Sequence, residues 1–235
     1  MRSNRPAMIA AAAGLAFGAA NADAQSSWAG VVSDSWFNPA RWTPAGVPNA
    51  AGTSVTLGLA GAYTVSMQNG SATCGTLTIS NPSAVLNIFD NAFLNVAGNI
   101  SNSSLIQISG PGAPGNTTRL QVAAGAVTIS GSGTLRLASQ GSGDSDSAYL
   151  YYTSAANVLT NAAGHTIAGA GRFYANLSNN GTVNADQNGK YLLMIEQPKT
   201  NAGTMTASGG GVLQFRNVGL TQTGSGQLVS SNDSP

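Results

Sequence analysis

The chain has few charged residues, few aromatic residues and only one cysteine and one histidine. Of its 235 residues, 7% are charged and 6% are aromatic, and nine Lys and Arg against eight Asp and Glu leave a formal charge of +1. A nucleic-acid binder needs a clustered basic face, so this balance argues against that class. Low charge also argues against the disorder that follows from high net charge.

The single cysteine and the single histidine limit the metal chemistry. Cys74 has no partner for an intramolecular disulfide, and one thiolate does not make a zinc site of the usual kind. His165 alone does not form a multi-histidine metal centre. We therefore predict no catalytic residue, no metal site and no cofactor for this chain.

Residues 1–24 have the three parts of a secretory signal peptide. Arg2 and Arg5 give a positive start, an uncharged apolar run follows, and Ala22-Asp23-Ala24 supplies the small-x-small pattern that predicts cleavage before Gln25. The run is shorter than the ~20 residues that span a bilayer, so we favour a signal peptide over a membrane anchor. We expect an exported chain, extracellular or on the outer cell surface, that passes through the periplasm.

From residue 54 onward, short runs alternate apolar and polar residues, and each run stops at Gly, Asn or Ser. Such alternation indicates half-buried β-strands, and Gly and Asn supply the positive φ of tight corners. No sustained 3.6-residue apolar pattern occurs outside the signal peptide, so we predict an all-β chain. The expected strands are 54–57, 76–79, 85–88, 93–96, 105–108, 120–122, 127–129, 135–137, 191–195 and 212–215.

The second half of the chain contains an internal repeat. Asn179-Asn-Gly-Thr-Val183 and Asn201-Ala-Gly-Thr-Met205 are clear copies, with related units at 161–167 and 223–228. A period near twenty residues with two or three strands per period is the spacing of a β-solenoid coil. We expect apolar residues inside, Thr, Ser, Asn and Gln outside, and Gly and Asn at the corners. The apolar anchors lie 16, 22 and 23 residues apart, at Ile167, Val183, Met205 and Leu228.

All three tryptophans lie before the first clear strand, within the segment 25–53. Trp28, Trp36 and Trp42 could cover the apolar open end of the solenoid, because an uncapped coil exposes core and unpaired strand edges. They could instead form a sugar-stacking platform, because Trp presents a large apolar face. Their terminal position favours the cap.

The order Trp28, Asp34-Ser-Trp36, Trp42, followed by Gly75-Thr-Leu-Thr-Ile-Ser80, resembles the start of autotransporter-type passenger β-helices and related extracellular repeat proteins of Gram-negative bacteria. The Asn-x-Gly-Thr units of the second half look like their internal coils. The resemblance implies a right-handed parallel β-helix on or outside the cell surface, commonly adhesive or structural.

These patterns predict three segments: a signal peptide at 1–24, an N-terminal cap at 25–53 and a β-solenoid at 54–235. The sequence departs from the family pattern because no run of barrel-type strands follows Leu228. We therefore expect either a passenger truncated at its C-terminus or a small free secreted β-helix.

Two polar features are candidate sites. His165 interrupts the repeat and could act as a base, but the sequence offers no Ser or acid partner, so we favour a surface corner. Asp144 and Asp146 in Gly141-Ser-Gly-Asp-Ser-Asp-Ser147 could bind Ca²⁺ through oxygen ligands, or belong to a solvated insertion between coils. The pattern of a helical calcium loop is missing, which favours the insertion and leaves calcium binding open.

Three tyrosines follow this acidic segment. Alternation puts Tyr149 and Tyr151 on one face of a strand and Tyr152 on the other. If exposed, they could hold a sugar or a partner protein. If buried, they would form a core layer or pack laterally on the coil, and we favour this second interpretation.

The function predicted from these features is that of a secreted or surface-exposed non-catalytic β-solenoid, adhesin-like or structural. Its expected partners are host or matrix glycans or proteins, or further copies through the coil ends, and no nucleic acid. The alternative is a carbohydrate-active β-helix, either a polysaccharide lyase-like enzyme or a sugar-binding protein. A lyase would need at least two carboxylates and a Lys or Arg in one groove. The remaining acids are scattered along the sequence, at Asp34, Asp90, Asp186, Glu196 and Asp233.

Overall fold

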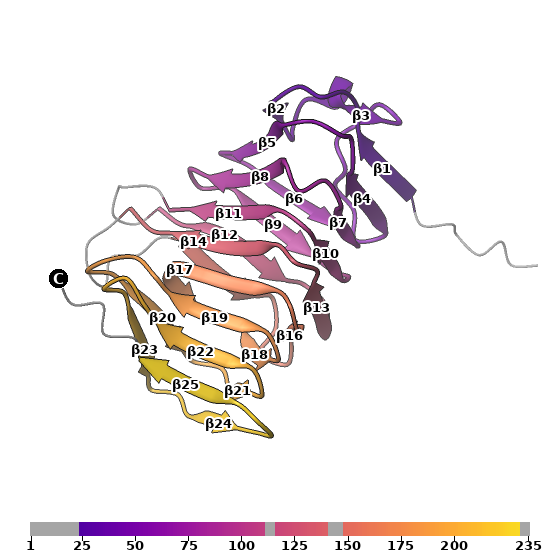
Figure 1. Cartoon of the computed structure of the whole chain (residues 1–235). Helices are drawn as coiled ribbons and strands as arrows, with labels where there is room; N and C mark the ends of the chain where they lie inside the picture. Colours follow the sequence, from indigo (N-terminus) through magenta and orange to yellow (C-terminus); the bar gives the residue numbers. More distant parts are fainter. Residues whose placement is uncertain (1–23, 111–115, 141–147, 231–235) are drawn as a thin grey trace, which may run out of the picture.

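A computed structural model of the chain describes residues 24–110, 116–140 and 148–230, and shows an all-β fold (Figure 1). The chain runs in turn through three parallel sheets, which we name A, B and C. From β4 (Thr53–Leu57) onward, each complete circuit adds one strand to each sheet, except that β17 (Thr166–Phe173) belongs to both B and C. This arrangement is a parallel β-helix, as the sequence predicts. The predicted signal peptide, residues 1–24, lies outside the described residues except for Ala24, which begins the first strand.

Sheet A contains β1 (Ala24–Trp28), β4 (Thr53–Leu57), β7 (Leu77–Ile79), β10 (Ile100–Asn102), β13 (Ala126–Ser130), β16 (Val158–Asn161), β18 (Asn176–Asn179), β21 (Lys199–Asn201) and β24 (Leu220–Gln222), with β3 (Trp42–Thr43) antiparallel to β1. Sheet B contains β2 (Asp34–Ser35), β5 (Tyr63–Gln68), β8 (Ala84–Phe89), β11 (Leu105–Ser109), β14 (Thr134–Ala138), β17 (Thr166–Phe173), β19 (Thr182–Ala185), β22 (Thr204–Ala207) and β25 (Gln227–Ser230). Sheet C contains β6 (Ser71–Cys74), β9 (Phe93–Val96), β12 (Thr118–Val122), β15 (Ala148–Tyr152), the end of β17, β20 (Tyr191–Ile195) and β23 (Val212–Arg216).

The core is a set of side-chain columns that run along the axis of the solenoid. Residues of neighbouring coils stack in register, so each inward side chain contacts its counterparts above and below. Burying one such aliphatic side chain contributes about 1.5–3 kcal/mol. One column of sheet B consists of Val65, Leu86, Ile106, Leu135, Ile167, Val183, Met205 and Leu228. The four anchors of the sequence repeat are its last four members, so the predicted stacking is confirmed.

The expected strands are all present, but the sequence pattern missed several others, including β5, β6, β16 and β18. The longest described strand is β17, with eight residues. In the structure this strand continues from sheet B into sheet C without a corner loop. Gly169 makes the passage possible: it has φ +107°, and a Cβ there would lie 1.9 Å from the Leu137 carbonyl oxygen.

The only helix among the described residues is a single short turn, η1 (Pro39–Arg41). Within this described part, no helix is long and apolar enough to cross a membrane.

Candidate functional site

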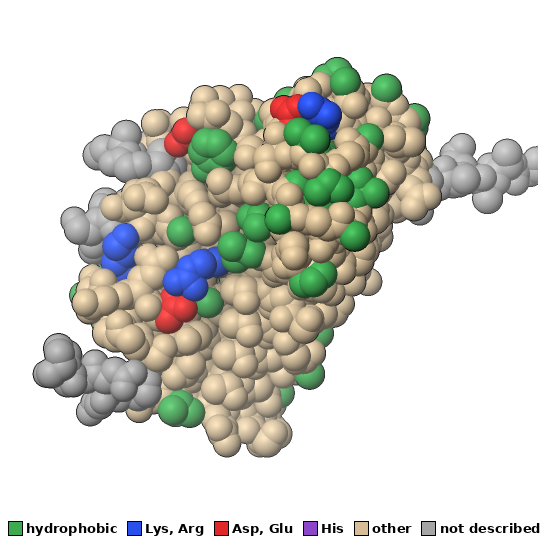
Figure 2. Space-filling model, turned by 45° about the horizontal axis from the view of Figure 1, so that its top comes forward, with side chains coloured by type: hydrophobic (Ala, Val, Ile, Leu, Met, Phe, Trp, Pro, Cys, Tyr) green, Lys and Arg blue, Asp and Glu red, His purple; other side chains and the backbone are tan. Residues whose placement is uncertain are grey.

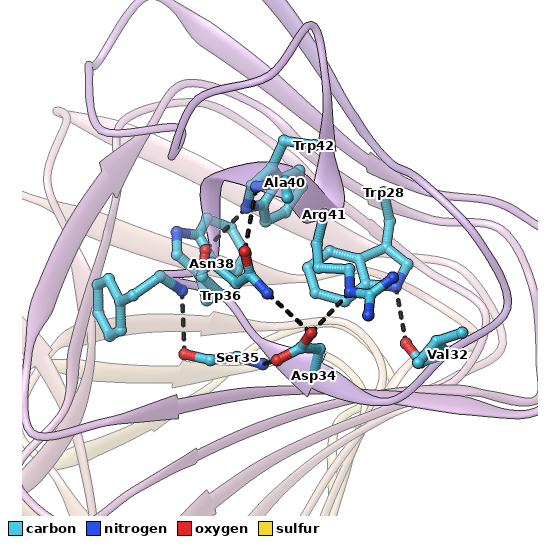
Figure 3. A network of polar contacts seen from close by, with 10 residues as sticks. Trp28, Val32, Asp34, Ser35, Trp36, Asn38, Ala40, Arg41 and Trp42 are labelled. Carbon is cyan, nitrogen blue, oxygen red and sulfur yellow. Dashed lines mark hydrogen bonds and ion pairs between the residues drawn. The ribbon is translucent and has the colours of Figure 1, made fainter.

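The three tryptophans form a buried cluster at the N-terminal end of the solenoid (Figure 3). The Trp42 ring meets the rings of Trp28 and Trp36 edge-on, with centroid distances of 5.0 and 4.8 Å. None of the three side chains is more than 2% exposed. The predicted cap is therefore present, and the ring faces are not available as a platform for sugars.

Polar groups fix the loop that carries this cap. Each indole N–H donates to a backbone carbonyl: Trp42 to Trp36 at 2.7 Å, Trp28 to Val32 at 3.2 Å and Trp36 to Pro48 at 3.3 Å. Asp34 accepts from Arg41 at 2.6 Å and from Asn38 at 2.9 Å (Figure 3). The Arg41 guanidinium holds the pKa of the Asp34 carboxyl below its usual value. These contacts explain the Asp-x-Trp spacing as structural.

The outward side of sheet C carries an aligned row of aromatic and arginine side chains. Phe93, Arg119, Tyr149 and Arg172 occupy the same register position on four successive strands. Tyr151 and Tyr174 flank this row, with the Tyr174 ring 5.2 Å from that of Tyr149 and 4.9 Å from that of Tyr151. We call these six residues the aromatic–arginine face; each is half-buried.

Arg119 lies at the centre of this face. Its guanidinium carbon is 4.9 Å from the Phe93 ring centroid, 5.1 Å from that of Tyr151 and 5.9 Å from that of Tyr149. Its Nε donates to the Thr117 hydroxyl at 3.1 Å. Cation–π contacts of this kind hold a guanidinium in place while leaving part of its donor edge for a ligand.

The tyrosine prediction was right about lateral packing and wrong about a core layer. Tyr149 and Tyr151 point outward from β15, and burial raises the pKa of the Tyr149 hydroxyl. Tyr152 pairs with the inward Val122, yet at the strand end its ring stacks on Tyr151 at 4.9 Å. Its hydroxyl donates to Glu196 at 2.8 Å, and this bond raises the pKa of Tyr152. All three rings thus reach the same side of the solenoid.

The prediction that His165 is a surface corner was wrong, because its side chain is fully buried. Its Nδ1 donates to Asn161 Oδ1 at 2.8 Å, and its Nε2 accepts from Asn102 Nδ2 at 3.1 Å. Asn102 belongs to a coil two turns earlier, and Gly131 and Gly133 of the intervening coil leave room for this contact. Burial lowers the pKa of His165 to about 4, so the ring is neutral at physiological pH.

A ladder of buried amides continues from this histidine. Asn161 Nδ2 donates to Asn179 Oδ1 at 2.7 Å, Asn179 Nδ2 donates to Asn201 Oδ1 at 2.7 Å, and Asn201 Nδ2 donates to Gln222 Oε1 at 2.8 Å. The same amides also donate to corner carbonyls, such as Asn179 to Thr204 at 3.2 Å. The repeated Asn of the Asn-x-Gly-Thr unit is therefore an interior residue, whereas the sequence pattern placed it at the corner.

A second interior charge, Lys199, was not predicted. Lys199 is fully buried in sheet A between Leu177 and Leu220. Its ammonium donates to the carbonyls of Ile195, at 3.0 Å, and Gln197, and lies 5.6 Å from the Phe173 ring centroid. Burial lowers the pKa of Lys199 to about 7. The contacts bind the corner between sheets C and A, which is a structural role.

The four described carboxylates each have a separate neighbour. Asp34 pairs with Arg41 in the cap, and Asp186 pairs with Arg136 over sheet B. Asp90 accepts from Gln68 at 2.8 Å, and Glu196 accepts from Tyr152. Within residues 24–110, 116–140 and 148–230, no group of three His, Cys, Asp or Glu side chains is close enough to hold a metal ion. The side of the molecule in Figure 2 correspondingly shows a few isolated red and blue patches on a largely uncharged surface. Asp144, Asp146 and Asp233 lie outside the described residues.

The last described coil exposes apolar side chains. Leu228 is 57% exposed and Val229 is 41% exposed, beside a hollow of about 500 Å³ that is also lined by Leu213 and Phe215. Self-association through coil ends, which the sequence suggests, stays a prediction.

Comparison of the chain with protein-family profiles, with curated protein sequences and with solved structures finds no match.

Proposed function

We propose that this chain is an exported, non-catalytic β-solenoid that works as an adhesion or structural module at the cell surface. The observation that carries the proposal is the aromatic–arginine face on the outer side of sheet C, where four half-buried side chains lie in register and two half-buried tyrosines flank them. Aromatic and arginine side chains contribute most of the binding energy at many interfaces.

The scaffold suits this role. A parallel β-helix holds each outward side chain at a fixed spacing of ~4.8 Å from its counterpart on the next coil. The rings therefore lose little freedom when a ligand binds, because the strands and the neighbouring rings already hold them. The N-terminal sequence supports export, because residues 1–24 have the pattern of a signal peptide.

Export and adhesion are testable together. The full chain with a C-terminal epitope tag is produced in a Gram-negative host, and mass spectrometry of the exported fraction identifies its first residue. We expect Gln25 at the new N-terminus, together with binding of the exported protein to immobilised matrix or cell surfaces. Retention of the uncleaved chain in the cytoplasm, or export without any such binding, would contradict the proposal.

A sugar-binding protein is the second candidate, because half-exposed tyrosine rings offer apolar faces on which sugar rings stack. The lyase-like form of this alternative makes a separate prediction. It requires the chain to release unsaturated oligosaccharides from an acidic polysaccharide, which ultraviolet absorbance detects. Binding without such release would separate the sugar-binding form from the enzyme.

A further inference from the structure

We infer that the aromatic–arginine face binds a linear anionic polysaccharide that lies along the axis of the solenoid. This inference rests on the proposed adhesion function and names the chemical class of its ligand. The acidic groups of this polysaccharide are carboxylates or sulfates, and its sugar rings lie on the tyrosine rings of the face.

The first support is the shape of the face. Phe93, Arg119, Tyr149 and Arg172 form one row, with one residue per coil and ~4.8 Å between neighbouring strands. Because aromatic and arginine side chains alternate along the row at equal spacing, the row matches a polymer whose units repeat along its length. Each member of the row is half-buried on the outer side of sheet C, so the row is a surface track.

The second support is the chemistry of the rings and their neighbours. Tyr149, Tyr151 and Tyr174 combine apolar faces with hydroxyls, which suits the mixed surface of a sugar. Next to them, Gln121 and Asn95 form a parallel row in register with Tyr151. Their amides supply donors and acceptors for sugar hydroxyls.

The third support is charge. The ion pairs among the described residues are Arg41–Asp34 and Arg136–Asp186, so within that part of the chain Arg119 pairs with no carboxylate. Its guanidinium is held by the surrounding rings, and a planar guanidinium binds a carboxylate through two parallel hydrogen bonds. Arg172 lies in the same row, and its Nη1 donates to the Tyr174 hydroxyl at 3.2 Å. An acidic ligand complements this arrangement better than a neutral one.

A nucleic acid shares the anionic backbone and also stacks on aromatic rings. The observations favour the polysaccharide because single-stranded nucleic acids need an extended basic groove, whereas this chain has a formal charge of only +1. An oligonucleotide therefore serves as one arm of the test.

The test measures binding of the purified chain to four probes by isothermal titration calorimetry. The probes are an oligogalacturonate, the same oligosaccharide with its carboxylates methyl-esterified, a heparin oligosaccharide and an oligothymidylate. We expect at least one acidic oligosaccharide to bind, with an affinity that falls as salt rises. We expect the methyl ester to bind at least about tenfold more weakly than the free acid, because it keeps the sugar faces and loses the charge.

Three results would overturn the inference. Equal binding of the acid and its methyl ester would indicate a platform for neutral sugars. Tighter binding of the oligothymidylate than of both acidic oligosaccharides would indicate a nucleic-acid site. Binding of neither acidic oligosaccharide would leave the face without this class of ligand.

Variants locate the site. Arg119→Gln is expected to raise the dissociation constant at least about tenfold, because it removes a charge-assisted pair. Gln121→Glu adds a repelling charge in the neighbouring row with little change in size, and is expected to weaken binding similarly. Arg136→Gln, on sheet B, is the matched control and leaves binding unchanged. Circular dichroism and the thermal midpoint confirm that each variant is folded.

The two proposals fail in different ways. If cells that display the chain adhere equally well with Arg119→Gln, and no acidic oligosaccharide binds, the ligand assignment is wrong and the adhesion function stands. If the chain is not exported but the purified protein binds the acidic probes through Arg119, the surface function is wrong and the binding site stands.

Discussion

The two halves of sheet A fill the same interior position with opposite chemistry. In the first half the column consists of aliphatic side chains, Val55, Leu77, Ile100 and Ile129. From the next coil onward the same column contains Asn161, Asn179 and Asn201, with His165 and Lys199 buried nearby. The backbone register does not change at this boundary. A solenoid coil thus tolerates either an apolar or a polar interior, provided that every buried amide has a partner.

The two halves should respond differently to perturbation. Apolar burial is non-directional and loses stability in proportion to the atoms removed. A hydrogen-bonded ladder is directional, and one wrong group leaves several neighbours without partners. The polar half also contains two buried groups, His165 and Lys199, whose pKa values fall to about 4 and about 7, so we expect the pH sensitivity between acid and mildly alkaline pH to be concentrated there.

Asn179→Asp should have the largest effect. The substitution keeps the shape of the side chain but replaces the amide that donates to Asn201, Gly181 and Thr204 with a group that accepts. We expect the free energy of unfolding to fall by about 4 kcal/mol, as for a buried group left without compensation. Chemical denaturation measures it, and Asn180→Asp on the exposed neighbour is the control. Equal, small losses for both variants would show that the ladder contributes little.

Acid should destabilise the polar half through His165. Its pKa is about 4 in the folded chain and 6.5 in the unfolded chain, so the unfolded chain binds the proton first. Stability is then complete above pH 6.5 and is lost as the pH falls towards 4, by about 3 kcal/mol in total. Denaturation across this window measures the loss. His165→Gln should remove this part of the pH dependence, while the contribution of Asp34, whose pKa is also lowered, remains in both proteins.

Lys199 should make the free energy of unfolding rise as the pH rises above 7, by less than the change expected from His165. Its folded pKa is about 7 and its ordinary value is 10.5, so the unfolded chain holds more protons between these values and stability rises with pH. We expect a gain of about 2 kcal/mol from pH 7 to about pH 9. The free energy of unfolding of Lys199→Met should not change with pH over this range. A wild-type curve that is equally flat would mean that the ammonium stays charged in the folded chain.

Ile129→Val should have the smallest effect, because it removes one buried methyl group from the apolar half. The expected loss is about 1 kcal/mol, with no change in pH dependence. Hydrogen exchange at acid pH extends the comparison, since amides of β16, β18 and β21 should exchange before those of β4, β7 and β10. Uniform exchange along sheet A would remove the distinction between the halves.

The sequence predicts the apolar part of this protein well and the polar interior poorly. Ile167, Val183, Met205 and Leu228 stack as their spacing indicates, because period-two alternation and a regular coil length are local properties. The tryptophan cap was predictable because the three tryptophans precede the first strand that the alternation pattern predicts, at 54–57. These features depend on residues that lie close together in the sequence.

The burial of His165 depends instead on residues that are distant in the sequence. Its place is created by the missing side chains of Gly131 and Gly133 and by the amide of Asn102, 63 residues away. The aromatic–arginine face has the same origin, because Phe93, Arg119 and Tyr149 become neighbours only once the coil lengths fix the register. The one signal in the sequence was the repetition of Asn at 161, 179 and 201, which a corner explains equally well.

The amide ladder has a further electrical consequence. From Asn161 through Asn179 and Asn201 to Gln222, every amide donor points towards the C-terminal coils. The side-chain dipoles therefore add, as peptide dipoles do in an α-helix, whereas the sheets around them have only a small net dipole. The interior of the solenoid is polarised along its axis, with its positive end at Gln222.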